Sequence, residues 1–139
     1  MICGRSIGSG PACYLAAKYN PLCLILISPI KSVVSIAKNI VGSLANLLME
    51  ERFDNMKIVN KVKCPVAIVH GIDDKLVPIK DSQSLLVEGF TNTKAHLFQR
   101  QGMTHNQYFY VSDVVRPLKY FFKCHHIYFN YKESIKLKS

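Results

Sequence analysis

Three short motifs in this sequence of 139 residues carry side chains that can do covalent chemistry together. The first, Gly4-Arg5-Ser6-Ile7-Gly8, follows a short apolar run and opens a helical pattern. In a strand–turn–helix of this kind the serine stands at the tip of a tight turn, at a helix N-terminus whose N–H groups favour negative charge. The tight turn excludes bulky side chains two residues before and two residues after the serine, which predicts that both glycines are required. Ser6 is the candidate nucleophile.

An acid and a histidine follow two later apolar runs. Asp74 lies in His70-Gly71-Ile72-Asp73-Asp74-Lys75-Leu76-Val77-Pro78, and His105 lies in Gly102-Met103-Thr104-His105-Asn106. A serine hydroxyl is a poor nucleophile near neutral pH, so it needs a histidine base that a carboxylate orients. The chain order is Ser, Asp, His, with steps of 68 and 31 residues. This order differs from those of the chymotrypsin and subtilisin types.

Apolar runs that alternate with helical patterns must position these motifs. Strands are expected at 22–27, 65–70 and 94–99, and helices at 7–19, 32–50, 81–88 and 107–128. Pro11 falls in the first turn of its helix, where a missing N–H does no harm, and Pro117 is expected to kink or break the last helix. The alternation predicts an α/β domain with a parallel sheet.

The motifs resemble those of α/β-hydrolase-fold serine hydrolases, over the C-terminal half of that fold. The resemblance is closer to the compact eukaryotic α/β-hydrolase domain-containing proteins, which include protein depalmitoylases, than to serine-aminopeptidase-like hydrolases. It rests on residues 4–11, Leu26-Ile27-Ser28-Pro29-Ile30, His70-Gly71-x-x-Asp74-x-x-Val77-Pro78 and Gly102-x-x-His105-Asn106. It covers residues 1–123 as the C-terminal part of a hydrolase domain, a mostly parallel sheet with helices on both faces. Residues 124–139 are left as a basic tail.

The resemblance implies a role for each candidate residue. Ser6 would be the nucleophile, His105 the base that accepts its proton, and Asp74 the acid that orients His105. The backbone N–H of Ile7 would supply one oxyanion donor. The implied reaction is hydrolysis of ester or thioester bonds through an acyl-enzyme on Ser6, with an acyl-protein thioesterase as the narrower form. The substrate would be a small acyl ester, a thioester or an acylated protein. No cofactor and no metal is implied.

Several residues in or near the motifs have alternative interpretations. Asp73 could replace its neighbour as the acid, although the spacing to Val-Pro favours Asp74. Ser9 is expected to be a small packing residue, and His70 to satisfy a local backbone hydrogen bond. His125 and His126 have no third ligand nearby, so no metal site is expected.

The sequence departs from the hydrolase pattern at its front. In the complete fold four strands and an oxyanion loop precede the strand before the nucleophile, and none is found before Ser6. The chain is therefore expected to be a truncated form with little or no catalysis of its own. The apolar stripe at 33–49 is expected either to border an acyl pocket or to pack in the core.

Composition restricts the remaining classes of function. With 49% hydrophobic and 19% charged residues, extensive disorder is excluded. No apolar run reaches the roughly 20 residues of a membrane-spanning helix, and no signal segment opens the chain. The net charge is +9, but no nucleic-acid motif accompanies it, so no nucleic-acid partner is expected. Cys3, Cys13, Cys23 and Cys64 lie in apolar segments, as buried, reduced thiols do.

These features predict an intracellular protein, in the cytoplasm or at the cytoplasmic face of a membrane. Peripheral membrane association remains open because of the basic tail. Two alternatives to an esterase also remain. One is a peptidase-like α/β-hydrolase, and the other is an inactive fragment that binds a membrane or a partner chain.

Overall fold

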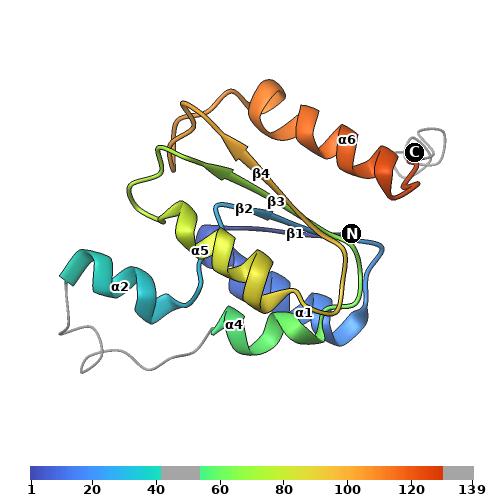
Figure 1. The fold of residues 1–139 in the computed structure, drawn as a ribbon, viewed down its shortest axis with the longest axis horizontal. Coiled ribbons are helices and arrows are strands. Elements are labelled where there is room, and N and C mark those ends of the chain that lie inside the picture. The colour runs from blue at the N-terminus through green and yellow to red at the C-terminus, as the bar shows by residue number, and fades with distance from the viewer. Residues whose placement is uncertain (42–53, 130–139) are drawn as a thin grey trace, which may run out of the picture.

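A parallel four-stranded sheet forms the centre of the molecule (Figure 1). The computed structural model describes residues 1–41 and 54–129. The strands are β1 (Ile2–Arg5), β2 (Leu24–Ile27), β3 (Val66–Gly71) and β4 (Ala95–Arg100), and their order in the sheet is their order in the chain. The prediction of an α/β domain with a parallel sheet is confirmed.

The register brings the carboxyl ends of the strands to one level. Arg5 is paired with Ile27, Ile27 with Val69, and Val69 with Phe98. The segments that follow the four strands therefore leave the sheet along one edge. This edge is where open α/β sheets build their sites.

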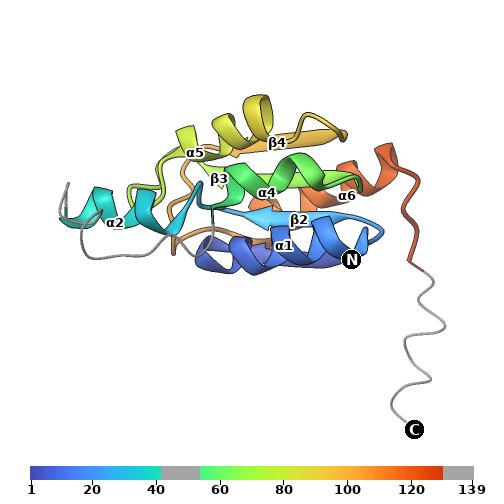
Figure 2. The same ribbon diagram turned by 90° about the horizontal axis from the view of Figure 1, so that it is seen from below.

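Helices cover both faces of the sheet (Figures 1 and 2). In chain order the helical elements are η1 (Ser6–Gly8), α1 (Ser9–Tyr19), α2 (Val33–Val41), α4 (Asn55–Ile58), η3 (Val59–Lys61), α5 (Ile79–Ser84), η4 (Leu85–Gly89), η5 (Tyr110–Val115) and α6 (Arg116–Cys124). Helices α1, α4 and α5 lie on one face, and α6 lies on the other.

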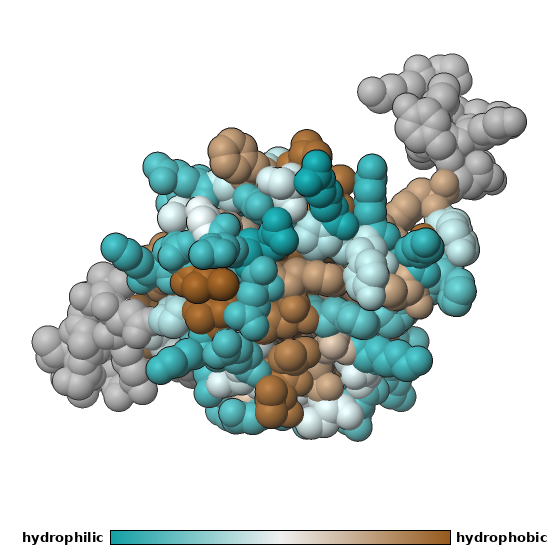
Figure 3. Space-filling view, turned by 45° about the horizontal axis from the view of Figure 1, so that its top comes forward, coloured by the Kyte–Doolittle hydropathy of each residue, from teal (hydrophilic) through white to brown (hydrophobic). Residues whose placement is uncertain are grey.

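Alternate residues of β2 feed two separate cores. Leu24 and Leu26 pack on the side of α1, whereas Ile25 and Ile27 pack on the side of Phe121 in α6. All residues of β2 and β3 are buried, which explains why these strands are continuous apolar runs. Outside the cores, polar side chains cover most of the surface seen in Figure 3, with separate hydrophobic patches between them.

The helices differ from the predictions in detail. Pro11 lies in the first turn of α1, as expected. The final helical region changes from the π-helical turn η5 to α6 at Arg116, next to Pro117, so the proline marks a change of helix type. The short helical turns α4 and η3 were not predicted. Of the helix expected at 32–50, residues 42–50 lie outside the described residues.

His70 is a buried polar group within β3. Its Nε2 lies 3.0 Å from the carbonyl oxygen of Val77, and its Nδ1 lies 2.6 Å from Oγ of Ser82. A carbonyl oxygen only accepts, so Nε2–H donates to Val77 and the Ser82 hydroxyl donates to Nδ1. The neutral ring thus ties β3 to the loop before α5 and to α5 itself. Burial lowers the pKa of His70.

Helix α1 lies close against β1 because Gly4 has no side chain. A Cβ atom at Gly4 would lie 2.6 Å from Cβ of Ala12 and 2.6 Å from the carbonyl oxygen of Gly8. A Cβ at Gly8 would meet nothing within 4 Å. The requirement for glycine is therefore present at Gly4, and the same expectation for Gly8 is wrong, because Gly8 has helical angles and faces open space.

The two glycines make a matched pair of variants. We expect Gly4→Ala to lower the free energy of unfolding by about 1–3 kcal/mol, since β1 and α1 must separate to admit a methyl group. Gly8→Ala should change it by less than about 0.5 kcal/mol. Urea denaturation followed by circular dichroism measures both. Equal effects of the two changes would contradict this account of the packing.

Acid should destabilise the fold through His70. Its pKa lies below the unfolded value of about 6.5, so near and below this pH the unfolded chain binds a proton that the folded chain does not. We therefore expect the free energy of unfolding to fall between about pH 7 and about pH 5. The pKa of His125 is also lowered by burial and contributes with the same sign.

Urea titrations at a series of pH values test this expectation. The slope of unfolding free energy against pH should become smaller in His70→Asn. It should persist in His126→Asn, which changes an exposed histidine. An unaltered slope in His70→Asn would show that His70 does not carry the effect.

Candidate active site

Ser6 occupies a strained position at the end of β1. Its φ is 50°, in the left-handed region that side chains other than glycine rarely adopt. The chain turns there from β1 directly into η1 and α1. Strain of this kind is concentrated at functional sites, and a G-x-S-x-G turn requires it to hold the serine clear of the backbone.

The structure brings Ser6, His105 and Asp74 into one hydrogen-bonded chain. Oγ of Ser6 lies 3.1 Å from Nε2 of His105, and Nδ1 of His105 lies 2.7 Å from Oδ2 of Asp74. The carboxylate can only accept, so Nδ1 carries the proton and Nε2 is left to accept from the serine hydroxyl. Asp73 lies outside this chain, and its Oδ2 accepts instead from the N–H of Gly102 at 2.7 Å.

Asp74 is held by the backbone of its own loop. Its Oδ1 accepts from the N–H groups of Leu76 at 3.0 Å and Val77 at 2.8 Å, while Oδ2 accepts from His105. Burial alone would raise the pKa of Asp74, but the hydrogen bonds from Val77 and His105 outweigh it and lower the pKa. The carboxylate is thus ionised near neutral pH and can stabilise a protonated His105.

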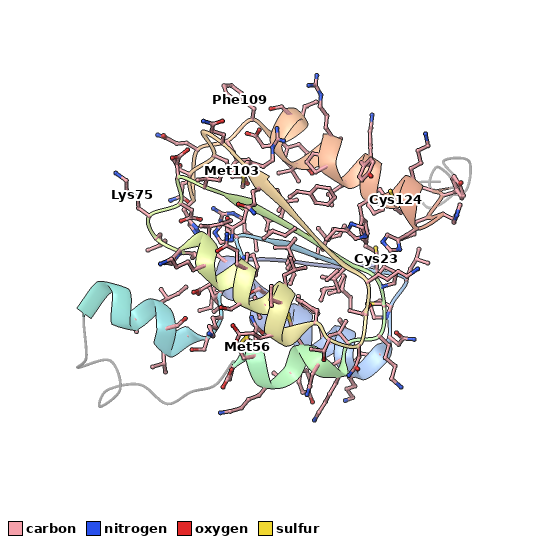
Figure 4. All side chains as sticks on the ribbon, viewed as in Figure 1. Cys23, Met56, Lys75, Met103, Phe109 and Cys124 are labelled. Carbon is pink, nitrogen blue, oxygen red and sulfur yellow. The ribbon has the colours of Figure 1, made fainter. Side chains whose placement is uncertain are left out.

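The loop that carries His105 runs directly against the end of β3. A Cβ at Gly71 would lie 1.9 Å from the carbonyl oxygen of Met103, so only glycine fits there. Met103 is fully buried and lies in the interior, between the ends of β3 and β4 (Figure 4). Thr104 and Gln107 close the loop, because the N–H of each donates to an oxygen of the other. These contacts fix His105 relative to the β3 loop that holds Asp74.

Arg5 joins the serine and histidine motifs, and the sequence analysis missed it. Its guanidinium donates to the carbonyl oxygen of His105 at 2.5 Å and to Oδ1 of Asn106 at 2.9 Å. The two motifs are about a hundred residues apart in the chain. The only signal in the sequence is the position of Arg5 beside the candidate nucleophile.

Ser9 fixes the other side of the turn. Its hydroxyl donates to the carbonyl oxygen of Ser6 at 2.6 Å and accepts from the N–H of Ile30 and from Nδ2 of Asn55, both at 3.2 Å. Ser9 is fully buried. It therefore does more than the small packing residue expected from the sequence, since it ties the turn to the segment after β2 and to α4.

An apolar cavity of about 310 Å³ opens beside Ser6. It is lined by Ser6, Ile7, Ile30, Val33, Ile36, Ala37 and Leu76. Three of these residues come from α2, so the described part of the 33–49 stripe borders the candidate nucleophile. Ile7 is exposed and directly follows Ser6 at the start of η1.

The other candidate groups lie apart from this site. Nε2 of His125 lies 3.0 Å from Nε2 of His96, and within the described residues no group of three or more potential ligands surrounds a metal position.

Cys3 is exposed, which corrects its expected burial; it lies on β1, an edge strand of the described sheet. Burial raises the pKa of Cys13 to about 12. Residues 130–139 of the basic tail lie outside the described residues.

None of the helices in the described part of the chain has the length and apolar character needed to cross a membrane.

Comparison with known proteins relates this geometry to a fold. No family model matches the chain. The chain is 31% identical over 85 residues to the human alpha/beta hydrolase domain-containing protein 17B, an alignment that covers 61% of this chain and 28% of the relative. It is 30% identical over 82 residues to the alpha/beta hydrolase domain-containing protein aho-3 of Caenorhabditis elegans, covering 59% of this chain and 24% of that protein. The chain spans less than a third of the curated relatives that it matches.

Solved structures share the architecture. Est1E from Butyrivibrio proteoclasticus matches with a TM-score of 0.68 and 22% identity, covering 91% of this chain and 60% of that one. The Pyrococcus horikoshii acylaminoacyl peptidase matches with a TM-score of 0.66 and 13% identity, covering 93% of this chain and 24% of that one. Together with the two curated relatives, the shared parallel sheet shows that the described residues adopt part of the α/β-hydrolase fold.

Proposed function

We propose that Ser6, His105 and Asp74 are the catalytic triad of a serine hydrolase. The observation that carries the proposal is the unbroken hydrogen-bonded chain from Oγ of Ser6 through the His105 ring to Asp74. The φ of 50° at Ser6 also supports it, because backbone strain of this kind is concentrated at functional sites.

Each residue then has a defined step. His105 takes the proton of Ser6 through Nε2 while Oγ attacks the acyl carbon, and Asp74 stabilises the imidazolium that forms. The N–H of Ile7 at the start of the helix donates to the oxyanion. His105 returns the proton to the leaving atom, and an acyl group remains on Ser6. Water then attacks the acyl group while His105 accepts a proton from the water, and His105 returns this proton to Oγ of Ser6 as the acid is released.

The substrate class that the site favours is an ester or thioester with an apolar acyl group. The apolar cavity borders Ser6 on the side of Ile7, where the acyl chain of a bound substrate would extend. An acyl-protein thioesterase is the narrower form, with acylated protein as its substrate. The five free cysteines and the net charge of +9 support an intracellular setting and peripheral contact with an anionic membrane surface.

Peptide hydrolysis is the second candidate. The Pyrococcus horikoshii structure is named as an acylaminoacyl peptidase, whereas another neighbour of this fold is named as the esterase RhEst1 from Rhodococcus. A panel of ester, thioester and amide substrates with the same acyl group separates these reactions. We expect the ester and thioester to acylate Ser6 and the amide to be inert.

A fluorophosphonate probe tests the nucleophile in the 139-residue chain. We expect stoichiometric labelling at Ser6, with the N–H of Ile7 donating to the oxyanion that forms. Labelling should be lost in Ser6→Ala and in His105→Ala, and it should remain in Ser84→Ala. Intact-mass and peptide mass spectrometry measure it. A folded chain that is not labelled, or is labelled equally after Ser6→Ala, would refute the proposal.

The apolar cavity predicts a dependence on acyl length. Val33→Phe should fill part of the cavity and slow the acylation of Ser6 by octanoyl esters while leaving acetyl esters almost unaffected. Each methylene displaced from apolar contact costs about 0.8 kcal/mol, or roughly fourfold in rate. Val87→Phe is the matched control, because Val87 is exposed on η4 and does not line the cavity. Equal slowing of acetyl and octanoyl esters would place the acyl chain elsewhere.

A further inference from the structure

A second hollow, of polar character, opens beside His105. Its volume is about 570 Å³, and the residues that line it with His105 are Asp73, Lys75, Leu76, Thr104, Asn106 and Gln107. They come from the loops that follow β3 and β4, whereas the apolar cavity is formed mainly by η1, α2 and the segment after β2. Leu76 lines both and stands between them.

The position of this hollow assigns it a part in the proposed reaction. His105 must deliver its proton from Nε2 to the atom that leaves, so the leaving group has to lie beside the His105 ring. The acyl group lies beside Ser6 and Ile7, in the apolar cavity. The hollow is therefore placed to hold the leaving group, and this step of the inference rests on the proposed function.

The lining of the hollow presents hydrogen-bond donors. Oδ1 of Asn106 already accepts from Arg5, so the amide of Asn106 has its NH₂ group to offer. The Lys75 side chain extends from its loop away from the ribbon (Figure 4), and within the described part of the chain its ammonium has no ion-pair partner. These donors match a ligand that is rich in acceptor oxygens.

The hydrogen bonds of the charged side chains at the hollow also indicate which ligand charge it would accept. Asp73 is the only carboxylate among the residues that line it, and its Oδ2 already accepts from the N–H of Gly102. Lys75 contributes one positive charge. Outside the lining, Arg5 is hydrogen-bonded to Asn106 and Asp74 to His105, so the charges next to the lining residues balance. The carboxylate that lines the hollow is thus already hydrogen-bonded, whereas the ammonium of Lys75 is left to contact an anionic ligand.

We infer that the polar hollow is a leaving-group subsite for a thiol or alcohol that carries a carboxylate, with Lys75 as its cationic contact. Ser6 Oγ forms a bond to the acyl carbon, and the bond from that carbon to the sulfur or oxygen of the leaving group breaks. The leaving atom takes its proton from Nε2 of His105 and departs as the free thiol or alcohol. Its carboxylate stays ionised throughout.

Thioesters that share one acyl group test the inference through the reaction. The octanoyl thioesters of 3-mercaptopropionate, 3-mercaptopropionamide and thiocholine carry a negative, a neutral and a positive leaving group. Octanoyl-Ser6 is followed by intact-mass spectrometry. We expect the carboxylate thioester to react about twofold to fivefold faster than the amide, as an exposed ion pair supports, and the thiocholine ester to react most slowly. The preference should shrink in high salt.

Charge reversal identifies the contact. Lys75→Glu should abolish or invert the preference for the carboxylate thioester. Lys94→Glu makes the same change of charge at an exposed lysine before β4, at the opposite edge of the sheet, and should preserve the preference.

A binding measurement tests the subsite without the reaction. Propionate and propionamide are titrated into the full chain carrying Ser6→Ala, and the side-chain NH₂ signals of Asn106 and Gln107 are followed by NMR. Propionate should shift them saturably and propionamide should not, and the shifts should disappear when Lys75→Glu is added.

The outcomes separate the two proposals. Equal rates for the carboxylate and amide thioesters, or no propionate-dependent shift at Asn106 and Gln107, overturn the anionic subsite. Propionate shifts in a chain that never forms octanoyl-Ser6 support the anion site while contradicting the proposed hydrolase function.

Discussion

The whole candidate site depends on the parallel pairing of the four strands in one register. Because Arg5, Ile27, Val69 and Phe98 stand at one level, the residues that follow them emerge along one edge of the sheet. A slip of one residue between neighbouring strands would turn every side chain to the opposite face and mix the two cores. The alternation along β2, which feeds a different core at each successive residue, prevents that slip and so fixes the distances between the serine, acid and histidine loops.

Contacts on three sides of the turn at Ser6 hold this residue in an energetically unfavourable backbone conformation. A non-glycine residue in the left-handed region costs about 1–2 kcal/mol, and this cost must be offset by surrounding contacts. Gly4 admits α1 against β1, Ser9 fastens the Ser6 carbonyl to the segment after β2, and Arg5 reaches the His105 loop. The strain and the position of His105 are therefore parts of one arrangement.

Local chemistry made part of this arrangement predictable from the sequence. The buried strands are continuous apolar runs, and the residues around Ser6 and His105 occur in motifs that the proposed reaction requires. The contact of Arg5 with His105 could not be found in this way, because it joins residues about a hundred positions apart and obeys no local period. The short helical turns at 55–61 were not predicted for a related reason, because so few residues cannot show a helical repeat. The prediction for Gly8 was wrong because a Cβ there meets no other atom within 4 Å, and a sequence motif does not show where such open space lies.

The order of proton transfers in the proposed reaction requires different surroundings on the two sides of the His105 ring. The acyl group must face Ser6 and the leaving group must face His105, so any hydrolase of this geometry has two subsites on opposite sides of one ring. The two hollows that we propose for these subsites are made by different segments: η1, α2 and the segment after β2 line the apolar one, and the loops after β3 and β4 line the polar one. Leu76 alone belongs to both. In the proposed reaction, changes in α2 would therefore alter the acyl preference without moving Asp74 or His105, whereas the polar hollow is formed by the same loops that carry these two residues and is constrained by them.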